Sequence, residues 1–533
     1  MCKFLSQVAE NIVKTIPKTA YSSQYFLNYI PDYAVSGRFT FSTVTLITVR
    51  DVIFTMKNSS SCDMYGFNTR ILRCMGNFIY LPLTRLINWC ISRGIFPEVL
   101  KTARVVPIHK GGSTGDPNNF RPVSLLPLVG KVFEKILKSQ IVSYLEENSL
   151  LNVSQFGFRK GLSTSMAVND LAEFIYAGFE GKHLTGACLC DLSKAFDCVS
   201  HSLLIRKLEH YNFSKLSIDL LKSYLSNRSQ FVSVRGVSSD TMPITMGVPQ
   251  GSVLGPILFL IFINDLPYCL SKAKFTLFAD DTTLAVQGNS LEELVGRLGE
   301  ARSRVEDWFS SNLLSLNAAK SETIIFGLNT DLESKAVKFL GTMIDSKLNW
   351  NANVDYLANK IIKNIYLIRS LRPVVSDMVA MMAYHSLIEA HLRYSILAWG
   401  HAPAAGRLFG LQRRVVRVIS GLGYREDCRG AFMQLRVLTL PSIYIFECLK
   451  FVKQNICLFS ERAQVHDYAT RGSTELVVPF HRLSATRSGV SYYAPLFFNG
   501  LPDNIKILPI KKFESQVLDL LRKRVCYSFD EFF

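Results

Sequence analysis

The spacing of apolar residues predicts a chain in which helices and strands are interspersed. Short apolar or alternating runs bounded by turn residues indicate strands over residues 104–108, 120–126, 184–189, 231–235 and 323–327, with a strand pair over 338–345. Apolar positions at 3.6-residue spacing indicate helices over residues 65–96, 131–148, 164–180, 201–224, 257–266, 290–314, 361–371, 378–399 and 511–523. The run over 39–55 is rich in β-forming residues, so we expect it to be extended.

Two acidic residues interrupt an apolar, strand-like stretch at residues 275–286, FTLFADDTTLAV. The pattern predicts a hairpin with Asp280 and Asp281 at its tip. Adjacent like charges repel each other, and hard divalent ions such as Mg²⁺ prefer oxygen ligands. The simpler account of this stretch alone is an exposed polar turn, because Asp is common in turns.

A further acid, Asp191, ends the apolar run over 184–189, and Asp197 follows six residues later. A carboxylate at the end of a buried strand is costly unless it is paired or bound to metal. A third acid that meets Asp280 and Asp281 would complete a two-ion site, which can stabilise both the attacking and the leaving oxygen of a phosphoryl displacement.

Two other segments have residues suited to a nucleotide. The loop over 111–119 is rich in Gly, Ser, Asp, Pro and Asn, and it is flanked by the cations Lys101, Arg104, Lys110 and Arg121. Lys and Arg on a hairpin suit a triphosphate, although a solvated basic loop is the alternative. In the segment 247–256, Gly and Pro bracket Gln250, so the backbone can approach a flat ligand closely.

Charge and composition narrow the choice of partner. The 533 residues predict three or four domains at about 150 residues each, and 60 basic against 43 acidic residues give a net charge of +17. Such an excess suits nucleic acid or an anionic membrane, although a merely soluble basic protein is not excluded. The longest apolar run, 253–263, is too short to span a bilayer, and we see no signal peptide in residues 1–18. Nucleic acid is therefore the favoured partner, with no membrane.

The remaining signals admit two readings each. The segment 155–161, QFGFRKG, combines aromatic and basic residues as single-strand binders do. Burial of the two Phe rings in the protein core explains the aromatic residues equally well. The later helices carry arginines without nearby acids, as a nucleic-acid clamp would or an ordinary helical surface could: Arg369, Arg372, Arg393, Arg413, Arg414 and Arg417. The 12 cysteines contain no C-x-x-C pair, so we expect reduced, mostly buried thiols and no zinc site.

Taken together, these segments resemble the reverse transcriptase of non-LTR retrotransposons, most of all the jockey-like mobile elements. The resemblance covers roughly residues 50–520. It rests on eight blocks in the same order: RVVPIHK with NFRPVSLL, SQFGFRKG, DLSKAFDCV, SYLSNRSQ, GVPQGSVLGPILF, FADDT, LNAAKSE and KFLGTMID. The FADDT and PQGSVLGP blocks are especially specific.

The resemblance implies an α+β, right-hand polymerase fold, with an antiparallel palm sheet packed on helices. Fingers would span 61–180, the palm with the catalytic acids 181–345 and a helical thumb 346–425. Residues 1–60 would be an N-terminal extension of unknown role, and 426–533 a mostly helical C-terminal region.

Site roles carry over by position within the blocks. Asp191, Asp280 and Asp281 match the metal-binding carboxylates, which implies two Mg²⁺ ions or, alternatively, Mn²⁺. Lys320 matches a lysine proposed to protonate pyrophosphate. Six positions match substrate-binding residues. Lys110 and Arg121 match those that hold the triphosphate, and Gln250 and Gly251 match those that line the incoming nucleotide. Leu192 matches the residue whose backbone carbonyl binds the metal, and Phe196 matches the one that excludes the sugar 2′-hydroxyl. Phe339, Leu340 and Gly341 resemble the loop that grips the primer end.

These matches imply RNA-directed DNA polymerase activity, with an RNA template, a DNA primer or target and dNTPs as partners. A catalytically idle remnant that only binds nucleic acid is the alternative, although all three acids are intact. A related polymerase that makes RNA is disfavoured by Phe196. Related elements usually carry an endonuclease larger than residues 1–60 could hold. Two alternatives follow: a truncated genomic copy, or reliance on another protein such as a separate endonuclease or nucleic-acid-binding partner. The resemblance also implies an intracellular protein that acts in the nucleus.

Overall fold

The computed structural model describes residues 1–16, 28–31, 37–328, 335–464, 475–484, 486–487 and 489–533. The chain divides into two compact units. The first contains residues 1–161, 189–284 and 299–321, and the second contains 162–188, 285–298 and 322–533. Both contain helices and strands, which confirms the α+β class. No helix among the described residues is both long enough and apolar enough to cross a membrane.

The strands agree closely with the pattern of apolar residues. They are β1 (Thr102–His109), β2 (Phe120–Leu125), β3 (Leu184–Cys190), β4 (Arg228–Val234), β5 (Val237–Ser238), β6 (Met242–Ile244), β7 (Lys274–Phe278), β8 (Asp281–Gly288), β9 (Glu322–Phe326), β10 (Ala336–Phe339) and β11 (Thr342–Asp345).

The helices of the first half are α1 (Cys2–Thr15), α2 (Leu46–Thr55), α3 (Thr69–Met75), α4 (Asn77–Arg93), α5 (Leu128–Glu147), α6 (Thr164–Glu180), α7 (His201–His210), α8 (Lys215–Leu225) and α9 (Gly255–Ile263). Those of the second half are α10 (Leu291–Ser311), α11 (Asn351–Leu371), α12 (Asp377–Tyr384), α13 (Ala390–Arg393), α14 (Ile396–Trp399), α15 (Ala405–Ser420), α16 (Arg429–Gln434), α17 (Leu440–Gln454), α18 (Val490–Asn499), α19 (Asp503–Lys506) and α20 (Ile510–Arg524).

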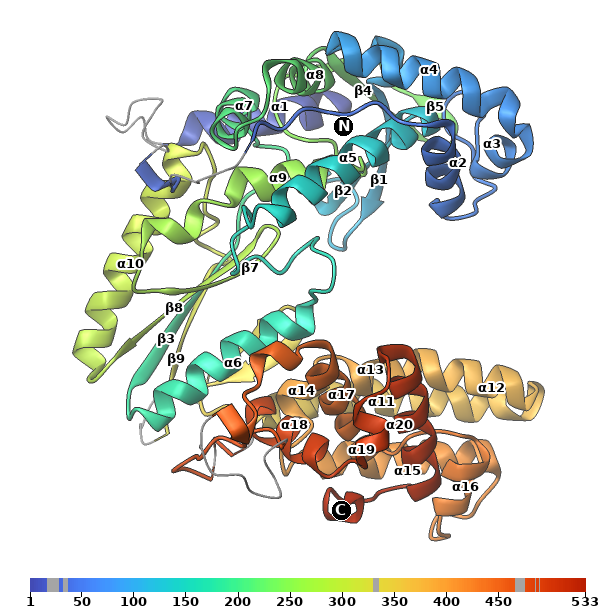
Figure 1. Ribbon diagram of the computed structural model, residues 1–533, viewed down its shortest axis with the longest axis vertical. Helices are drawn as coiled ribbons and strands as arrows, with labels where there is room; N and C mark the ends of the chain where they lie inside the picture. Colours follow the sequence, from blue (N-terminus) through green and yellow to red (C-terminus); the bar gives the residue numbers. More distant parts are fainter. Residues whose placement is uncertain (17–27, 32–36, 329–334, 465–474, 485, 488) are drawn as a thin grey trace. The chain divides into compact units, whose positions relative to one another are not determined.

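A five-stranded sheet in the first unit is built on the β1–β2 hairpin (Figure 1). β1 pairs antiparallel with β2 and parallel with β4, and β4 also pairs with β5 and β6. Val105 on β1 lies opposite Val232 on β4, and both pack with Cys2 of α1 in one buried cluster. Helix α1 is thereby anchored on this sheet.

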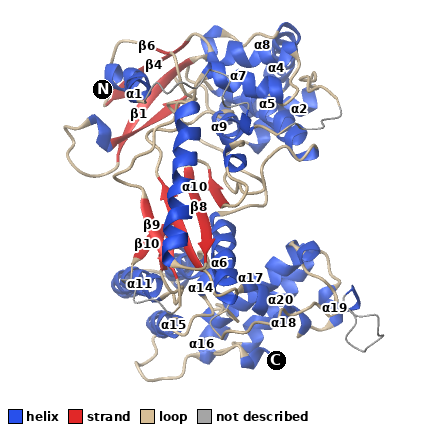
Figure 2. Ribbon diagram, turned by 90° about the vertical axis from the view of Figure 1, so that its left-hand side faces the viewer, coloured by secondary structure: helices blue, strands red, loops and turns tan. Residues whose placement is uncertain are grey.

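A four-stranded sheet has the order β7-β8-β3-β9. Because side chains alternate along a strand, the neighbours Thr185 and Gly186 of β3 face opposite sides. A Cβ built on Gly186 would meet Leu294 and Leu298 of α10, whereas Thr185 lies against Gly178 of α6. Helices α10 and α6 therefore cover opposite faces at this part of the sheet, as Figures 1 and 2 also show.

A buried ion pair ties together three helical segments of the first unit. The Nζ of Lys207 on α7 donates to Oδ1 of Asp265, just after α9, at 2.6 Å, and neither side chain is exposed to solvent. The Nζ also donates to the carbonyl of Phe262, while Nε1 of Trp308 on α10 donates to Oδ2 of Asp265 at 3.1 Å. Such hydrogen bonds partly replace the hydration that both charges lose on burial.

Two sequence predictions of local structure were wrong. The β-rich run over 39–55 contains helix α2, because the side chain of Thr45 caps it by accepting from the backbone N–H of Thr48, and α2 packs on α4 and α5. The helix predicted over 201–224 is two helices, since the chain turns at Asn212, which has a φ of +60°, and α8 then starts with Ser214 as its N-cap.

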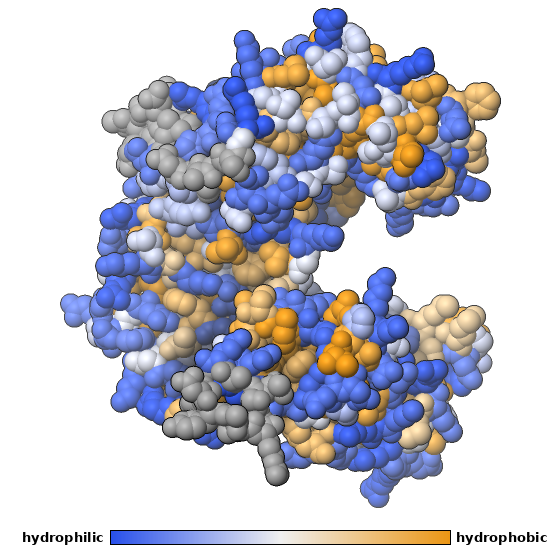
Figure 3. Space-filling model, in the orientation of Figure 1, coloured by the Kyte–Doolittle hydropathy of each residue, from blue (hydrophilic) through white to orange (hydrophobic). Residues whose placement is uncertain are grey.

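Two other predicted helices are also interrupted. The helix predicted over 65–96 bends at Gly76, between α3 and α4. The one predicted over 378–399 stops after α13 and restarts after Ser395, which has a φ of +52°. Helices α3 and α4 carry exposed apolar side chains: Ile71, Phe78, Leu81, Leu86 and Trp89. The surface over these two helices, at the upper right of Figure 3, shows several hydrophobic areas.

Candidate active site

The predicted acidic hairpin is present and its tip is held by a neighbouring loop. A turn of two residues, Ala279 and Asp280, joins β7 to β8, and Ala279 has a φ of +59°. Asp281 is the first residue of β8. The side-chain Oε1 of the buried Gln155 accepts two hydrogen bonds, from the backbone N–H of Gly157 at 2.8 Å and from that of Ala279 at 3.1 Å. One amide side chain therefore fixes the backbone beside the two acids.

Asp191 follows β3 directly, and a second segment fixes its backbone. Its carbonyl accepts from the N–H of Asn317 at 2.8 Å, and its N–H donates to the hydroxyl of Ser321 at 3.3 Å. Leu192 is buried and forms an isolated antiparallel bridge with Leu316. The segment that contains Lys320 is thereby attached to the backbone of the first predicted metal-binding acid.

The three acids interact electrostatically. Partial burial, followed by the charges of Asp280 and Asp191, raises the pKa of Asp281 to about 6. Burial and the charge of Asp191 also raise the pKa of Asp280, and Arg121 opposes this rise. The charge of Asp191 thus acts on both Asp280 and Asp281, and all three acids lie in the first unit.

Uncompensated negative charge of this kind fits a divalent cation bound by oxygen ligands. In the described part of the chain, however, no group of three or more His, Cys, Asp or Glu side chains is already arranged to hold an ion. The oxygen donors of the three carboxylates are of the kind that Mg²⁺ prefers.

A cluster of four cations lies in the same unit. Partial burial lowers the pKa of Lys110, and the positive charges of three neighbours lower it further. These neighbours are Lys194, Arg121 and Lys320. The β1–β2 hairpin explains part of this cluster, because Arg121 on β2 pairs opposite Ile108 and the N–H of Lys110 donates to the carbonyl of Asn119. The structure thus brings together the predicted Lys110, Arg121 and Lys320.

The loop that contains Gln250 is fixed against β2. The backbone N–H of Ser124 donates to the carbonyl of Gln250 at 2.8 Å, and a Cβ on Gly251 would lie 2.5 Å from the carbonyl oxygen of Ser124. The side-chain Nε2 of Gln250 donates to both carboxylate oxygens of Asp197, at 3.1 and 3.2 Å. The close approach at Gly251 is therefore made to the backbone of β2.

Phe196 is held by other rings. It stacks on Phe259 of α9, with centroids 4.3 Å apart and planes inclined by 20°, and it lies edge-on to the exposed Phe158. Phe156 is buried, so of the two rings in the QFGFRKG segment one belongs to the core and the other is open to a ligand.

The start of α9 is joined to α5 by a buried carboxylate. An Oε2 of Glu134, which is 1% exposed, accepts from the N–H of Val253 at 2.5 Å and from that of Leu254 at 3.0 Å. Burial raises the pKa of Glu134, and these two hydrogen bonds oppose the rise. Glu134 therefore supports the segment that follows Gln250.

The predicted primer-grip residues lie in the second unit, on the β10–β11 hairpin. Phe339 is buried, while Leu340 and Gly341 form the turn with φ of +44° and +87°. The hydroxyl of Tyr394 donates a hydrogen bond to the carbonyl of Leu340. This turn is thus fixed from outside the hairpin.

Two of the later arginines have acidic partners, contrary to the prediction from sequence. Arg372 pairs with Asp377 at 2.7 Å, and Arg393 pairs with Glu389 and Glu447 at 2.6 and 2.8 Å. Their contribution to a nucleic-acid clamp is reduced accordingly, because part of their charge is compensated within the protein.

Lys194 and Gln155 are members of this site that the sequence did not single out. Lys194 lies within DLSKAFD with a φ of +50°, and its position in that block was the available signal. Gln155 lies in the block SQFGFRKG, but its bond to a residue 124 positions away has no local signature.

Comparisons with known proteins agree with this site. Residues 108–344 match the family described as reverse transcriptase (RNA-dependent DNA polymerase). The RNA-directed DNA polymerase from mobile element jockey of Drosophila melanogaster is 26% identical over 460 residues, covering 80% of this chain and 50% of that protein. The probable RNA-directed DNA polymerase from transposon BS of Drosophila melanogaster is 30% identical over 374 residues, covering 65% and 41%.

The chain thus spans half or less of the length of these relatives. A crystal structure of the RNA-dependent RNA polymerase of a human picorbirnavirus is similar with a TM-score of 0.46 and 10% identity, covering 81% of this chain and 77% of that one. The resemblance to the polymerases of jockey-like elements is confirmed. The segment that matches the reverse transcriptase (RNA-dependent DNA polymerase) family, residues 108–344, contains the three acids, Lys110, Arg121, Lys320 and the Gln250 loop.

Proposed function

We propose that this chain is the RNA-directed DNA polymerase of a non-LTR retrotransposon, transferring a nucleotide from a dNTP to the 3′-hydroxyl of a primer. The observation that supports this most directly is the electrostatic coupling of Asp191, Asp280 and Asp281 in the unit that also contains the four-cation cluster. Acids that hold cations beside residues that bind phosphates are the parts that phosphoryl transfer requires.

Asp191, Asp280 and Asp281 would hold two Mg²⁺ ions, or Mn²⁺, with the carbonyl of Leu192 as a further ligand. When bound, such ions lower the pKa of an attacking hydroxyl and neutralise charge on the leaving pyrophosphate. The like-charge repulsion that raises the pKa of Asp281 supports this assignment, because a divalent cation would relieve it.

The cation cluster would bind the triphosphate. Lys110 and Arg121 contribute from the β1–β2 hairpin and Lys194 from the segment after β3. Ammonium and guanidinium groups bind phosphate oxygens through charge-assisted hydrogen bonds. Lys320 belongs to the segment that is bonded to Asp191, and it would donate a proton to the departing pyrophosphate.

Other residues would select the nucleotide and hold the primer. Phe196 would exclude a 2′-hydroxyl, since its ring is fixed by stacking on Phe259. Gln250 and Gly251 would line the nucleotide, and the turn at 339–341 would grip the primer end. Fingers, palm and thumb would be residues 61–180, 181–345 and 346–425.

The partners on this reading are an RNA template, a DNA primer or target and dNTPs. The site of action would be nuclear. An idle remnant that only binds nucleic acid remains the second candidate, and one assay distinguishes the two.

Primer extension on an RNA template with dNTPs and Mg²⁺ tests the proposal. We expect product from the native chain and a fall of at least about a hundredfold in Asp191→Asn, Asp280→Asn or Asp281→Asn, the scale on which loss of one preorganised electrostatic contact acts. Asp240→Asn, an exposed acid outside the site, is the matched control and should leave the rate unchanged. Retained RNA binding without extension by the native chain would instead establish the remnant.

Phe196→Ala separates a DNA-making from an RNA-making polymerase. We expect the variant to incorporate ribonucleotides more readily while it keeps its use of dNTPs. Discrimination as strong as in the parent would show that the gate lies elsewhere.

A further inference from the structure

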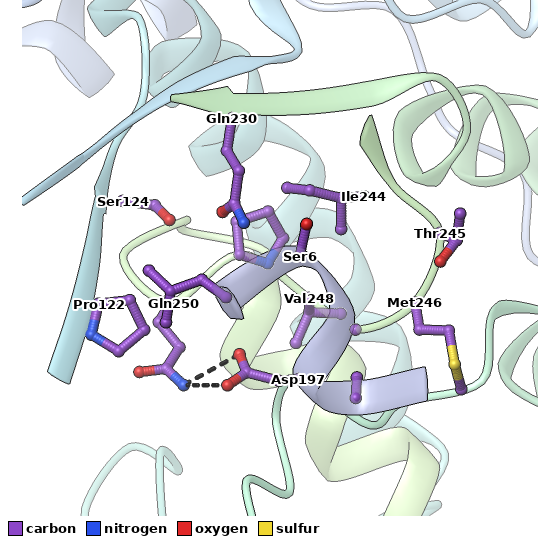
Figure 4. A pocket seen from close by; sticks show the side chains of 14 residues that line it. Ser6, Pro122, Ser124, Asp197, Gln230, Ile244, Thr245, Met246, Val248 and Gln250 are labelled. Atoms are coloured by element: carbon purple, nitrogen blue, oxygen red, sulfur yellow. Dashed lines mark hydrogen bonds between the residues drawn. The ribbon is translucent and has the colours of Figure 1, made fainter. Parts of the chain in front are cut away.

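Asp197 forms the most specific side-chain contact in the Gln250 loop, and none of the roles described so far uses it. Both of its carboxylate oxygens accept from Nε2 of Gln250 (Figure 4). An ionised carboxylate has no proton to donate, so only the NH₂ side of the Gln250 carboxamide can face it. The carbonyl oxygen, Oε1, then lies on the side away from Asp197, as Figure 4 shows.

The backbone brings these two segments together independently of the side chains. The N–H of Val248 donates to the carbonyl of Phe196 at 2.9 Å, and the N–H of Gly247 donates to that of Val199 at 2.8 Å. Asp197 lies between these two acceptors in sequence. Its carboxylate is therefore held at a fixed place relative to the loop that contains Gln250.

The pKa of the Asp197 carboxyl lies above its ordinary value, although neighbouring groups oppose the rise. Burial raises the pKa of this carboxyl, while Lys194, the Gln250 hydrogen bond and Lys110 lower it. Asp197 in turn raises the pKa of Lys110. It is thus a counter-ion within the cation cluster as well as the acceptor for Gln250.

Asp197 is not grouped with the three metal-binding candidates. Burial raises the pKa of Asp280 and Asp281 most, and the acid from outside the hairpin that raises both further is Asp191. A cavity of about 50 Å³ lies beside Asp197 and Gln250, with Leu5, Ser6 and Ala9 of α1 among its lining residues. This volume is sufficient for ordered water but far too small for a nucleotide, so a nucleotide does not reach Asp197 through it.

We propose that Asp197 is a positioning residue that orients the Gln250 carboxamide, so that Oε1 is presented to a donor group of the incoming nucleotide. This rests on the proposed function, since it assumes that Gln250 lines the nucleotide. In Asp197→Asn the NH₂ group of Gln250 no longer has to face residue 197, because an asparagine can donate as well as accept. The Gln250 carboxamide can then rotate by 180°, so that Nε2 replaces Oε1 on the nucleotide side.

Steady-state primer extension with varied dNTP tests this. Loss of a hydrogen bond to a charged group predicts a rise of about ten- to a hundredfold in the KM for dNTP in Asp197→Asn, with kcat and the thermal unfolding midpoint much less affected. Asp197→Glu, which keeps the acceptor-only charge, should recover part of the loss. Asp240→Asn is the control.

A double-mutant cycle separates positioning from general damage. If Asp197 acts through Gln250, then Asp197→Asn should add almost nothing to the KM effect of Gln250→Ala. Effects of the two substitutions that multiply fully, or a fall in kcat at unchanged KM, would overturn the proposal.

Equilibrium binding of a fluorescent dNTP to the protein with primer and template gives a second readout that needs no turnover. If the native chain binds dNTP but does not extend the primer, the proposed activity is wrong. The Kd values of Asp197→Asn, Gln250→Ala and the double variant for dNTP then still test whether Asp197 acts through Gln250. Absence of any dNTP binding by the native chain would overturn both.

Discussion

Gly247 is the residue at which a single methyl group should do the most damage to the nucleotide loop. Its φ is +83°, and a Cβ built there would lie 2.5 Å from the backbone carbonyl oxygen of Asp197. Left-handed backbone costs a non-glycine residue about 1–2 kcal/mol. Ordinary contact begins near 3.4 Å, so Gly247→Ala must also push the two backbones about 0.9 Å apart, and overpacking of this kind costs about 1–3 kcal/mol.

Gly236 is a matched control, because its φ is +84° and nothing lies within 4 Å of the Cβ position. Gly236→Ala should show the backbone cost alone and keep full primer extension. Gly247→Ala should be about 1–3 kcal/mol less stable than Gly236→Ala in urea unfolding and should lose extension by about tenfold or more, since the displacement moves Gln250. Equal stability and equal activity of the two variants would refute this account of the loop.

Three further perturbations follow from contacts described above. Lys207→Met leaves the buried Asp265 carboxylate without its cation, so we expect a loss of about 3–5 kcal/mol in unfolding free energy, with a smaller loss when Asp265→Leu is added; a double variant as unstable as the sum would contradict this. Glu134 has a raised pKa in the folded chain, so the folded state binds its proton more tightly and stability falls as pH rises from the ordinary glutamate range through the raised pKa. Glu134→Gln should remove that portion of the pH dependence in unfolding curves from pH 4 to 8, and parallel curves would show that this group does not contribute. Tyr394→Phe removes the hydrogen bond to Leu340, at a cost of about 1 kcal/mol, and should shorten extension products in a single-binding assay if the turn grips the primer; unchanged product lengths would place the grip elsewhere.

Local pattern was enough to predict most elements and the acidic hairpin. The alternation over 275–286 predicts Asp280 and Asp281 at the tip of a hairpin, and Asp280 lies in the turn between β7 and β8 while Asp281 is the first residue of β8. The pattern failed at 39–55, where the β-branched residues Thr45, Thr48 and Val49 favour a strand but a cap and packing against other helices produce α2. Intrinsic preference is a weak prior that tertiary contacts override.

Candidate site residues could be predicted where they lie within one recognisable block of sequence. They could not be predicted where their position depends on contacts between separate blocks. Asp191 and the Gln250 loop follow from their own segments. Lys194 interacts with Lys110, and Asp197 accepts a hydrogen bond from Gln250, in each case over more than 50 positions of sequence. Glu134 accepts from Val253, 119 positions away. Such pairings have no periodicity that a single sequence displays.

The hydrogen bonds by which Gln155 holds the hairpin tip determine how the site responds to pH and salt. The amide of Gln155 carries no charge and gains or loses no proton across the physiological range, and its bonds to Gly157 and Ala279 join it to backbone groups that also do not titrate. Acidity and ionic strength will therefore alter how strongly the neighbouring aspartates attract a cation without reshaping the framework that presents them. Inactivation by mild acid should accordingly be reversed at once on neutralisation, with no refolding delay.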